Sequence, residues 1–293
     1  MKLYLIGSMQ ATIPAKFVHG KSLPFFSSSL FGSCLGVRKL KTLTSLERKR
    51  DNRGLDVKQM AWRMEKCDGN GMGIGEFGVL RPAMEDYAQE AVKAVKAGKV
   101  IVVPTDTLYG FACDACSMDA VHRIYEIKGR KYTSPLAICV GDVEDIQRFA
   151  VTDHLPNGLL NSLLPGPVTL VLRRGVSSIL EKSLNPGLES IGVRVPDYNF
   201  IRLIARGSGS ALALTSANLS GHPSSLDIKD FENLWKYCAY IYDGGVIPSD
   251  RAGSTVVDLT EPGSYKILRH GSAKEETIGI LERHDLVANA NST

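Results

Sequence analysis

Short apolar runs rich in β-branched residues recur along the chain from about residue 100 onward. Runs of this length, bounded by glycine, proline or polar residues, are typical of buried strands. They predict strands at residues 100–103, 136–140, 168–172, 191–195, 212–214, 240–242, 254–258 and 266–269. The stretches between them favour helices, at residues 83–97, 117–127, 142–150, 154–163 and 198–206.

A chain of 293 residues could hold one large domain or two small ones. Because strands and helices interleave, the pattern predicts an α/β fold with a twisted mixed β-sheet flanked by helices. We expect this domain to span residues 81–273. Residues 274–293 are expected to form a C-terminal tail, with one or two helical turns followed by disorder. The chain shows no internal repeat.

The amino-terminal part has a different composition. Residues 1–46 contain no Asp or Glu, several lysines and a serine-rich centre. Such a composition is typical of a transit peptide, so we expect residues 1–55 to direct import into a mitochondrion or chloroplast. The alternative is a disordered tail of a protein in the cytoplasm. Residues 56–80 end in a glycine-rich stretch and are expected to form a flexible linker.

The bulk composition excludes several classes. Of the 293 residues, 44% are hydrophobic and 23% charged, and the net charge is +4. No run of about 18 apolar residues occurs, so no membrane association is expected. Six cysteines do not make a disulfide scaffold. Cys113 and Cys116 form a C-x-x-C, which we interpret as small, partly buried thiols, with a redox role as the alternative. The six histidines form no metal-binding motif, so no protein-ligated metal is expected.

Polar residues with binding chemistry follow the first strand. Thr105, Asp106, Thr107 and Tyr109 supply two hydroxyls, a carboxylate and a phenol directly after residues 100–103. A basic group, Lys128, Arg130 and Lys131, lies further on and precedes Ser134. Lysine as a mobile point charge and arginine as a bidentate clamp together suit a triphosphate. The alternative is a strand cap followed by a solvated charge cluster.

Later segments add further candidates. Thr169 follows a Pro-Gly-Pro turn, and Ser216 and Asn218 follow the short 212–214 strand, where an open α/β sheet binds nucleotides. Arg194 lies within an apolar strand. A guanidinium turned inward needs an acid or an anionic ligand, because burying it unpaired costs several kcal/mol. The alternatives are an arginine at the strand edge and, for Ser216 and Asn218, an ordinary turn.

The spaced motifs P-T-D-T-x-Y-G, K-x-R, P-G-P-V-T, G-V-R-x-P, S-x-N and S-T-V-V-D all occur within about residues 83–272. In this arrangement the chain resembles YrdC-like threonylcarbamoyl-AMP synthases. The resemblance implies a single α/β domain with a large basic concave cleft. It also implies that L-threonine, bicarbonate and ATP are condensed to threonylcarbamoyl-AMP and pyrophosphate. That is the first step of N6-threonylcarbamoyladenosine modification of tRNA, which a downstream threonylcarbamoyltransferase completes.

The resemblance also assigns roles to residues. Contacts to threonine or bicarbonate fall to Thr107, Tyr109, Arg194 and Thr169. Contacts to ATP fall to Lys128, Arg130, Lys131, Ser134, Ser216, Asn218, Ser254 and Arg269, with Lys128 and Arg130 acting in catalysis. Mg²⁺ is expected to arrive with ATP. Some family members carry a histidine on the strand after K-x-R, near threonine, but residues 136–140 contain none.

Three other functions are considered. A basic cleft of this fold could serve as an RNA-binding module for tRNA or double-stranded RNA without catalysis. Pyrophosphate release from ATP that requires threonine and bicarbonate would distinguish the synthase from it. The sugar-phosphate lyase chemistry of riboflavin precursor synthesis needs an acidic metal-binding cluster, which the sequence lacks. Hydrogenase-maturation carbamoyltransferases need additional zinc-finger and kinase-like regions, and longer synthases carry a further domain for which too few residues follow Gly271.

Overall fold

The fold was analysed in a computed structural model that describes residues 78–129, 134–175, 178–180, 182 and 184–289. The predicted transit peptide lies outside these residues, and so do the linker up to residue 77 and the Arg130–Lys131 pair. The described residues contain a mixed sheet with the strand order β1-β8-β2-β3-β7-β4-β6-β5-β9-β10-β11. The predicted α/β fold with a mixed sheet is therefore confirmed.

The sheet combines parallel and antiparallel neighbours. Its strands are β1 (Val79–Pro82), β2 (Ile101–Pro104), β3 (Tyr109–Asp114), β4 (Ala137–Cys139), β5 (Val168–Arg173), β6 (Ser190–Arg194), β7 (Leu212–Ser216), β8 (Tyr240–Asp243), β9 (Thr255–Asp258), β10 (Ser264–Arg269) and β11 (Val287–Ala288). All eight predicted strands are present. Three were not predicted: β1, which lies partly in the expected linker, β3 and β11.

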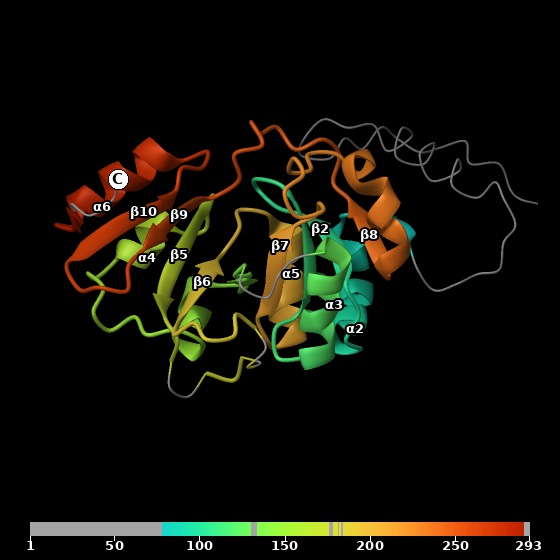
Figure 1. The fold of residues 1–293 in the computed structure, drawn as a ribbon, viewed down its shortest axis with the longest axis horizontal. Helices are drawn as coiled ribbons and strands as arrows, with labels where there is room; N and C mark the ends of the chain where they lie inside the picture. Colours follow the sequence, from blue (N-terminus) through green and yellow to red (C-terminus); the bar gives the residue numbers. More distant parts are fainter. Residues whose placement is uncertain (1–77, 130–133, 176–177, 181, 183, 290–293) are drawn as a thin grey trace, which may run out of the picture. The chain divides into compact units, whose positions relative to one another are not determined.

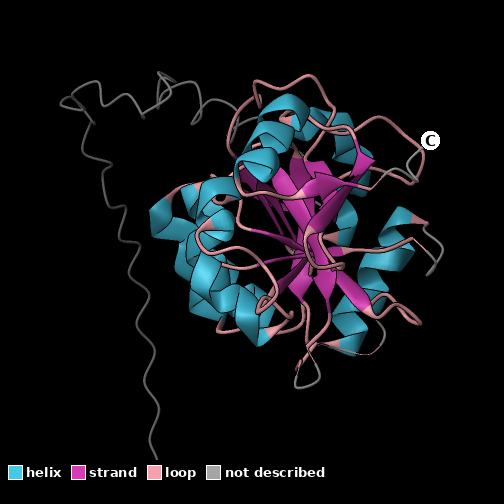
Figure 2. Ribbon diagram, turned by 90° about the vertical axis from the view of Figure 1, so that its left-hand side faces the viewer, coloured by secondary structure: helices cyan, strands magenta, loops and turns pink. Residues whose placement is uncertain are grey.

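Helices lie on both faces of the sheet, as Figure 2 shows. The α-helices are α2 (Ala88–Lys96), α3 (Met118–Lys128), α4 (Leu159–Leu163), α5 (Asn199–Ser208) and α6 (Lys274–Arg283). The 3-10 helices are η1 (Glu85–Tyr87), η2 (Val143–Arg148) and η3 (Ile228–Tyr237). Figure 1 places α2, α3 and α5 beside β2, β7 and β8, and α4 and α6 beside β5, β9 and β10. None of the described helices is long and apolar enough to span a membrane.

Two helix predictions need correction. The helix expected at residues 142–150 is the 3-10 helix η2. The helix expected at residues 154–163 is reduced to α4, which begins at Leu159. Pro156 and Gly158 explain the late start. Gly158 has a φ of 78°, which lies in the left-handed region and cannot continue a right-handed helix.

The C-terminal segment is more ordered than the sequence indicated. Helix α6 runs for ten residues, and β11 pairs with β10. Thr277, Leu281 and Leu286 are buried, and the two leucines belong to the main hydrophobic core. Residues 274–289 are therefore part of the folded domain and not a tail.

The sheet has an apolar core on each of its two faces. One contains α2 and α5 packed on residues such as Ala112, Leu212 and Cys139. The other, larger core contains α3 and the opposite sides of the same strands, including Phe111 and Ile138. Side chains alternate along a strand. A residue two positions from one under α2 and α5 therefore lies on the same face of the sheet. This holds for Gly110, Ala137 and Leu214, which are two positions from Ala112, Cys139 and Leu212.

Candidate functional site

A cleft of about 630 Å³ opens on the face of the sheet that carries α2 and α5. Its floor is made by alternate strand residues, and its walls by the loops after β2 and β7 and before β9. The lining includes most of the predicted site residues: Thr107, Tyr109, Lys128, Thr169, Arg194, Ser216, Asn218, Ser254 and Arg269. Residues that lie up to about half the chain apart in sequence are therefore brought to one cavity.

Gly192 keeps the floor of this cleft low. A Cβ atom added there would come to 3.1 Å from Thr169 Cγ2 and 3.6 Å from Ala137 Cβ. Both of those residues line the cleft. Any side chain at residue 192 would therefore occupy space that a ligand can otherwise use.

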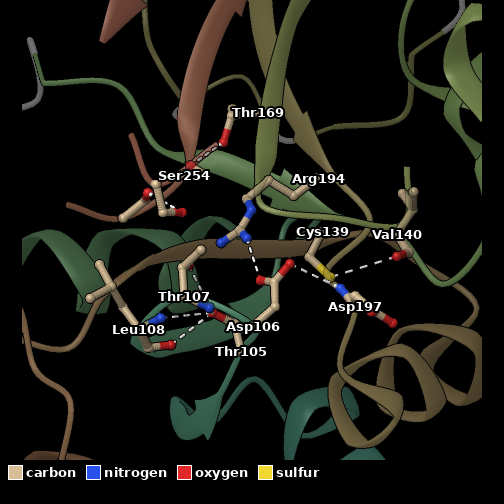
Figure 3. A network of polar contacts seen from close by, with 12 residues as sticks. Thr105, Asp106, Thr107, Leu108, Cys139, Val140, Thr169, Arg194, Asp197 and Ser254 are labelled. Carbon is tan, nitrogen blue, oxygen red and sulfur yellow. Dashed lines mark hydrogen bonds and ion pairs between the residues drawn. The ribbon is translucent and has the colours of Figure 1, made fainter. Parts of the chain in front are cut away.

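Arg194, at the end of β6, faces inward and has an acid as its partner. Its Nη2 donates to Asp106 Oδ1 at 2.6 Å, and the two side chains are only 8% and 10% exposed. The second oxygen of Asp106, Oδ2, accepts from the backbone N–H of Asp197 at 3.0 Å. The Nε of Arg194 is buried without a hydrogen-bond partner among the residues that the structure describes. Figure 3 shows the Arg194 guanidinium and the Asp106 carboxylate pointing toward one another.

The turn after β2 is organised by Thr105. Its hydroxyl donates to the Leu108 carbonyl at 2.8 Å and accepts from the backbone N–H groups of Thr107 and Leu108. Thr105 Oγ1 also lies 3.2 Å from Thr107 Oγ1. Such local hydroxyl-to-backbone bonds are typical of Ser/Thr turns. The turn therefore holds the Thr107 hydroxyl at the cleft and Asp106 behind it.

Thr169 and Ser254 form the opposite side of this region. Their hydroxyl oxygens lie 2.7 Å apart. Arg269 Nη2 donates to Ser254 Oγ at 3.0 Å and to the Ser254 carbonyl at 2.9 Å. A continuous chain of hydrogen bonds therefore runs from β5 through Ser254 to the end of β10.

Lys128 ends helix α3 at the other end of the cleft. The helix stops at Gly129, which adopts the left-handed conformation at the C-cap. Lys128 is 2% exposed, and its ammonium donates to the carbonyls of Ser216 and Asn218 at 2.5 and 2.8 Å and to Asn218 Oδ1 at 3.2 Å. The mobile point charge expected from the sequence is instead a fixed cation.

The same bonds tie the turn after β7 to α3. Ser216 Oγ donates to Asn218 Oδ1 at 2.5 Å, and Asn218 Nδ2 donates to the His222 carbonyl at 2.6 Å. Ser216 and Asn218 therefore lie in a well-connected turn next to a buried ammonium. Both interpretations of the S-x-N segment therefore apply: it forms a turn, and its polar residues line the cleft.

Tyr109 differs from its expected role. Its ring is fully buried against Phe231. Its hydroxyl donates to the Gly245 carbonyl at 2.7 Å and accepts from the backbone N–H of Gly244 at 2.9 Å. Burial, followed by the nearby Asp243 carboxylate, raises the pKa of this phenol well above its ordinary value. The structure thus gives Tyr109 an anchoring position between β3 and the loop after β8, and not a hydroxyl aimed at a ligand.

For three of the predicted ATP contacts the structure gives no position in the cleft lining. Arg130 and Lys131 lie outside the described residues. Ser134 is described and half-buried, but it is not among the residues that line the cleft. The positive charge expected of the cleft therefore stays a prediction, since two of its cations are not placed.

The sequence did not predict the contacts that Asp106 and Asn185 make. Asn185 is buried in the cleft wall, and its amide bonds both the N–H and the carbonyl of Leu136, at 2.6 and 2.8 Å. It adopts a φ of 57°, which asparagine tolerates better than most residues. The turn signal Asn-Pro-Gly was visible in the sequence, but its partner 49 residues away was not. For Asp106, the need of Arg194 for an acid was the one available signal.

The structure also describes possible metal ligands and the C-x-x-C thiols. Among the described residues, no three His, Cys, Asp or Glu side chains gather in a group that could hold a metal ion. Neither cysteine of the C-x-x-C forms a disulfide; Cys113 is buried and Cys116 half-buried. Burial, and then the neighbouring Asp114, raises the pKa of the Cys113 thiol far above its usual range. This fits the interpretation of both as small, partly buried thiols.

Fold and site define an α/β domain with a polar cleft formed by strand ends and loops. Residues 93–271 match the Sua5/YciO/YrdC protein family, which is described as "Telomere recombination". The chain belongs to this family.

Known relatives agree with that assignment. The chain is 44% identical over 235 residues to the threonylcarbamoyl-AMP synthase of Bos taurus, covering 78% of this chain and 84% of that protein. It is 45% identical over 208 residues to the synthase of Homo sapiens, covering 69% and 74%. Its structure is similar to that of P. abyssi Sua5 complexed with L-threonine, with a TM-score of 0.60 and 28% identity. That match covers 73% of this chain and 64% of the P. abyssi protein, less than two thirds of its length.

Proposed function

We propose that this protein is an L-threonylcarbamoyladenylate synthase, a nucleotidyltransferase. It condenses L-threonine, bicarbonate and ATP to threonylcarbamoyl-AMP and pyrophosphate. The relatives over most of the chain are threonylcarbamoyl-AMP synthases, and a structural neighbour was solved with L-threonine. The product would serve N6-threonylcarbamoyladenosine modification of tRNA.

One observation in the cleft carries the proposal. Thr169, which we assign to threonine or bicarbonate, is hydrogen-bonded at 2.7 Å to Ser254, which we assign to ATP. Arg194 lies at the same cleft, and its buried Nε has no hydrogen-bond partner within the described part of the chain. Lys128 supplies a fixed cation. An amino-acid site and a nucleotide site that share a wall would hold two substrates close enough to react.

The chemistry needs alignment more than a side-chain nucleophile. The amine of threonine attacks bicarbonate to form a carbamate and release water. A carbamate oxygen then attacks the α-phosphorus of ATP, and the bond to the β-phosphate oxygen breaks as pyrophosphate leaves. Both reactants are anions, so fixed positive charge and orientation lower the barrier. In this cleft Arg194 would hold the threonine carboxylate, and Lys128 with Arg130 would hold the phosphates.

Mg²⁺ is proposed as the companion of ATP. It would be carried by phosphate oxygens and water, which suits a cation that dehydrates reluctantly. Bound there, it would stabilise the charge on the leaving pyrophosphate. No protein cage is required for this role.

The test is pyrophosphate release from ATP by the purified full chain, with each substrate omitted in turn. We expect release only when L-threonine, bicarbonate and Mg²⁺–ATP are all present. Release without threonine would identify a different nucleotide chemistry. No release, together with salt-dependent binding of tRNA or double-stranded RNA, would favour the RNA-binding module.

Two further proposals concern the cellular setting. The acid-free composition of residues 1–46 supports import into a mitochondrion or chloroplast. Residues 1–60 fused to a fluorescent protein should then localise to that organelle, whereas a diffuse cytosolic signal would contradict import. Because threonylcarbamoyl-AMP is an intermediate, a downstream threonylcarbamoyltransferase must consume it. Modified tRNA should therefore appear only when such a transferase is added.

A further inference from the structure

Asp106 stands behind the cleft and not within it. It is absent from the cleft lining, whereas its neighbours Thr105 and Thr107 are part of it. Its side chain is 10% exposed, and both of its oxygens are engaged, Oδ1 by Arg194 and Oδ2 by the backbone N–H of Asp197. A ligand in the cleft would therefore meet Arg194 and not Asp106.

The contact restricts how Arg194 can present its guanidinium. That group is planar and carries five N–H donors in a fixed fork. Asp106 accepts a hydrogen bond from Nη2, while the buried Nε has no hydrogen-bond partner among the described residues. Rotating the guanidinium to offer different donors would break the 2.6 Å contact inside a nearly buried environment. Asp106 therefore stabilises the one orientation of the guanidinium that Arg194 has at the cleft.

Asp106 is itself held in place. The Thr105 hydroxyl closes the loop that carries Asp106, because it donates to the carbonyl of Leu108 and accepts from the N–H of the same residue. Its second oxygen is fixed by the chain just after β6, the strand that carries Arg194. The carboxylate therefore joins the turn after β2 to the end of β6, and its position is set independently of any ligand.

We propose that Asp106 is a positioning residue for the amino-acid substrate: it sets the orientation in which Arg194 offers its donors to the substrate carboxylate. This inference rests on the proposed function, in which Arg194 binds that carboxylate. The carboxylate charge of Asp106 alone would oppose an anionic ligand. A positioning effect therefore has a distinct sign, because removing Asp106 weakens carboxylate binding instead of strengthening it.

Asp106→Asn is the sharpest variant, because it preserves the volume of the side chain. One carboxylate oxygen becomes an NH₂ group, which must face a donor, either Arg194 Nη2 or the Asp197 N–H. Asp106→Glu keeps the charge and shifts the carboxylate. Asp142→Asn is the matched control, because Asp142 also accepts bonds from two arginines, Arg202 and Arg206, and is not among the residues lining the cleft.

The experiment measures pyrophosphate release by the full chain against threonine and against ATP, and inhibition by L-threoninamide, which lacks the carboxylate. We expect Asp106→Asn to raise the KM for threonine by about tenfold or more, in line with the loss of a charge-assisted hydrogen bond. The KM for ATP and the inhibition constant of the amide should change less than about threefold, within the spread of such couplings. Asp106→Glu should fall between Asn and wild type, and Asp142→Asn should match wild type.

Each other outcome decides against a specific claim. Equal losses for threonine and its amide, or for threonine and ATP, would make Asp106 a merely structural residue. Tighter threonine binding in Asp106→Asn would make it a competitor for Arg194. Should Asp106→Asn fail to fold, Asp106→Glu answers the same question, and an unchanged threonine KM in that variant overturns the inference. A wild-type protein without threonine-dependent release would instead overturn the proposed function.

Discussion

The cleft contains two nearly buried cations that are held in different ways. Lys128 is 2% exposed and donates to carbonyl and amide oxygens of one turn, at Ser216 and Asn218. Arg194 is 7% exposed and is paired with a carboxylate, that of Asp106. Three of the bonds that Lys128 makes go to oxygens of the turn after β7, whereas Arg194 bonds a carboxylate.

This difference separates two kinds of recognition. An ammonium fixed at one end of the cleft suits the recognition of a highly charged phosphate chain. A guanidinium neutralised by an acid keeps mainly its directional donors, which suit a singly charged carboxylate. One cleft can thus direct triphosphate and amino acid to different ends. The comparison predicts that each end is lost separately.

Arg194→Ala should have the largest effect, because it removes one partner of a buried ion pair. Leaving Asp106 buried and unpaired is expected to cost about 3–5 kcal/mol of unfolding free energy. Threonine binding should be lost while ATP binding is retained. Urea unfolding and calorimetric titration with each ligand measure both effects.

The control for Arg194→Ala is the double variant with Asp106→Asn. It removes the uncompensated charge, so it should recover most of the stability without recovering threonine binding. Retained threonine affinity in the single variant, or equal loss of ATP, would show that the two ends are not separate.

Lys128→Ala tests the other end. The lost charge-assisted bonds are each worth about 1.5–3 kcal/mol, which corresponds to roughly 10- to 150-fold in ATP affinity. Threonine binding should be comparatively unaffected, since Arg194 and Asp106 are untouched. Lys96→Ala, which removes an exposed lysine at the end of α2, is the control and should bind both ligands normally. A threonine defect as large as the ATP defect would count against the division.

The fold was predictable where burial alone determines the element. Each apolar run became a strand, because such runs are stable only when both faces are covered. Strand β3 was missed since it contains Gly110 and begins within a polar motif. Glycine there has a packing reason, as a Cβ would come to 2.8 Å from Leu214 Cδ1. Helix α6 was underestimated because its stability comes from tertiary burial of Leu281, which local sequence does not reveal.

The sequence motifs pointed to residues that the structure brings to one cleft, but not to the contacts between them. The motifs identified Arg194 and Ser254, and the energetic argument showed that Arg194 needs an anion. The identity of that anion depends on a contact across 88 residues, between Asp106 and Arg194. The same is true of Lys128, whose acceptors lie 88 and 90 residues away. Such pairings are set by sheet topology, and no local pattern in one sequence encodes them.

Gly271→Ala should perturb the wall that both ends share, with a smaller effect than either cation. A Cβ at residue 271 would come to 2.2 Å from the backbone atoms Ser254 C and Thr255 N, so Ser254 must move. That shift would stretch the 2.7 Å contact between Ser254 and Thr169. We expect about 1–3 kcal/mol of destabilisation, as for overpacking, and weaker binding of both ligands.

The matched control is Gly279→Ala, within α6, where the nearest atom to an added Cβ is Arg283 Nη1 at 3.5 Å. Alanine there should be neutral or stabilising by up to about 1 kcal/mol, because alanine favours helices over glycine. A Gly271→Ala protein that loses only one ligand would place Ser254 at one end of the cleft and not between the two.

The smallest expected effect concerns the reactivity of Cys139, which lies on β4 in register with Arg194 on β6. Its thiol is fully buried, and burial raises its pKa to about 12, against which the nearby Arg194 acts only in part. Since the thiolate is the reactive form, Cys139 should resist alkylation at pH 8 in the native protein. Among the four described cysteines, half-buried Cys116 should be alkylated first.

Mass spectrometry of peptides from protein alkylated with iodoacetamide measures the order of labelling. Urea-unfolded protein, in which all six cysteines should be labelled, is the control. Labelling of Cys139 ahead of Cys116 would mean that β4 and β6 separate readily. Asp106 could then not hold the Arg194 guanidinium in one orientation.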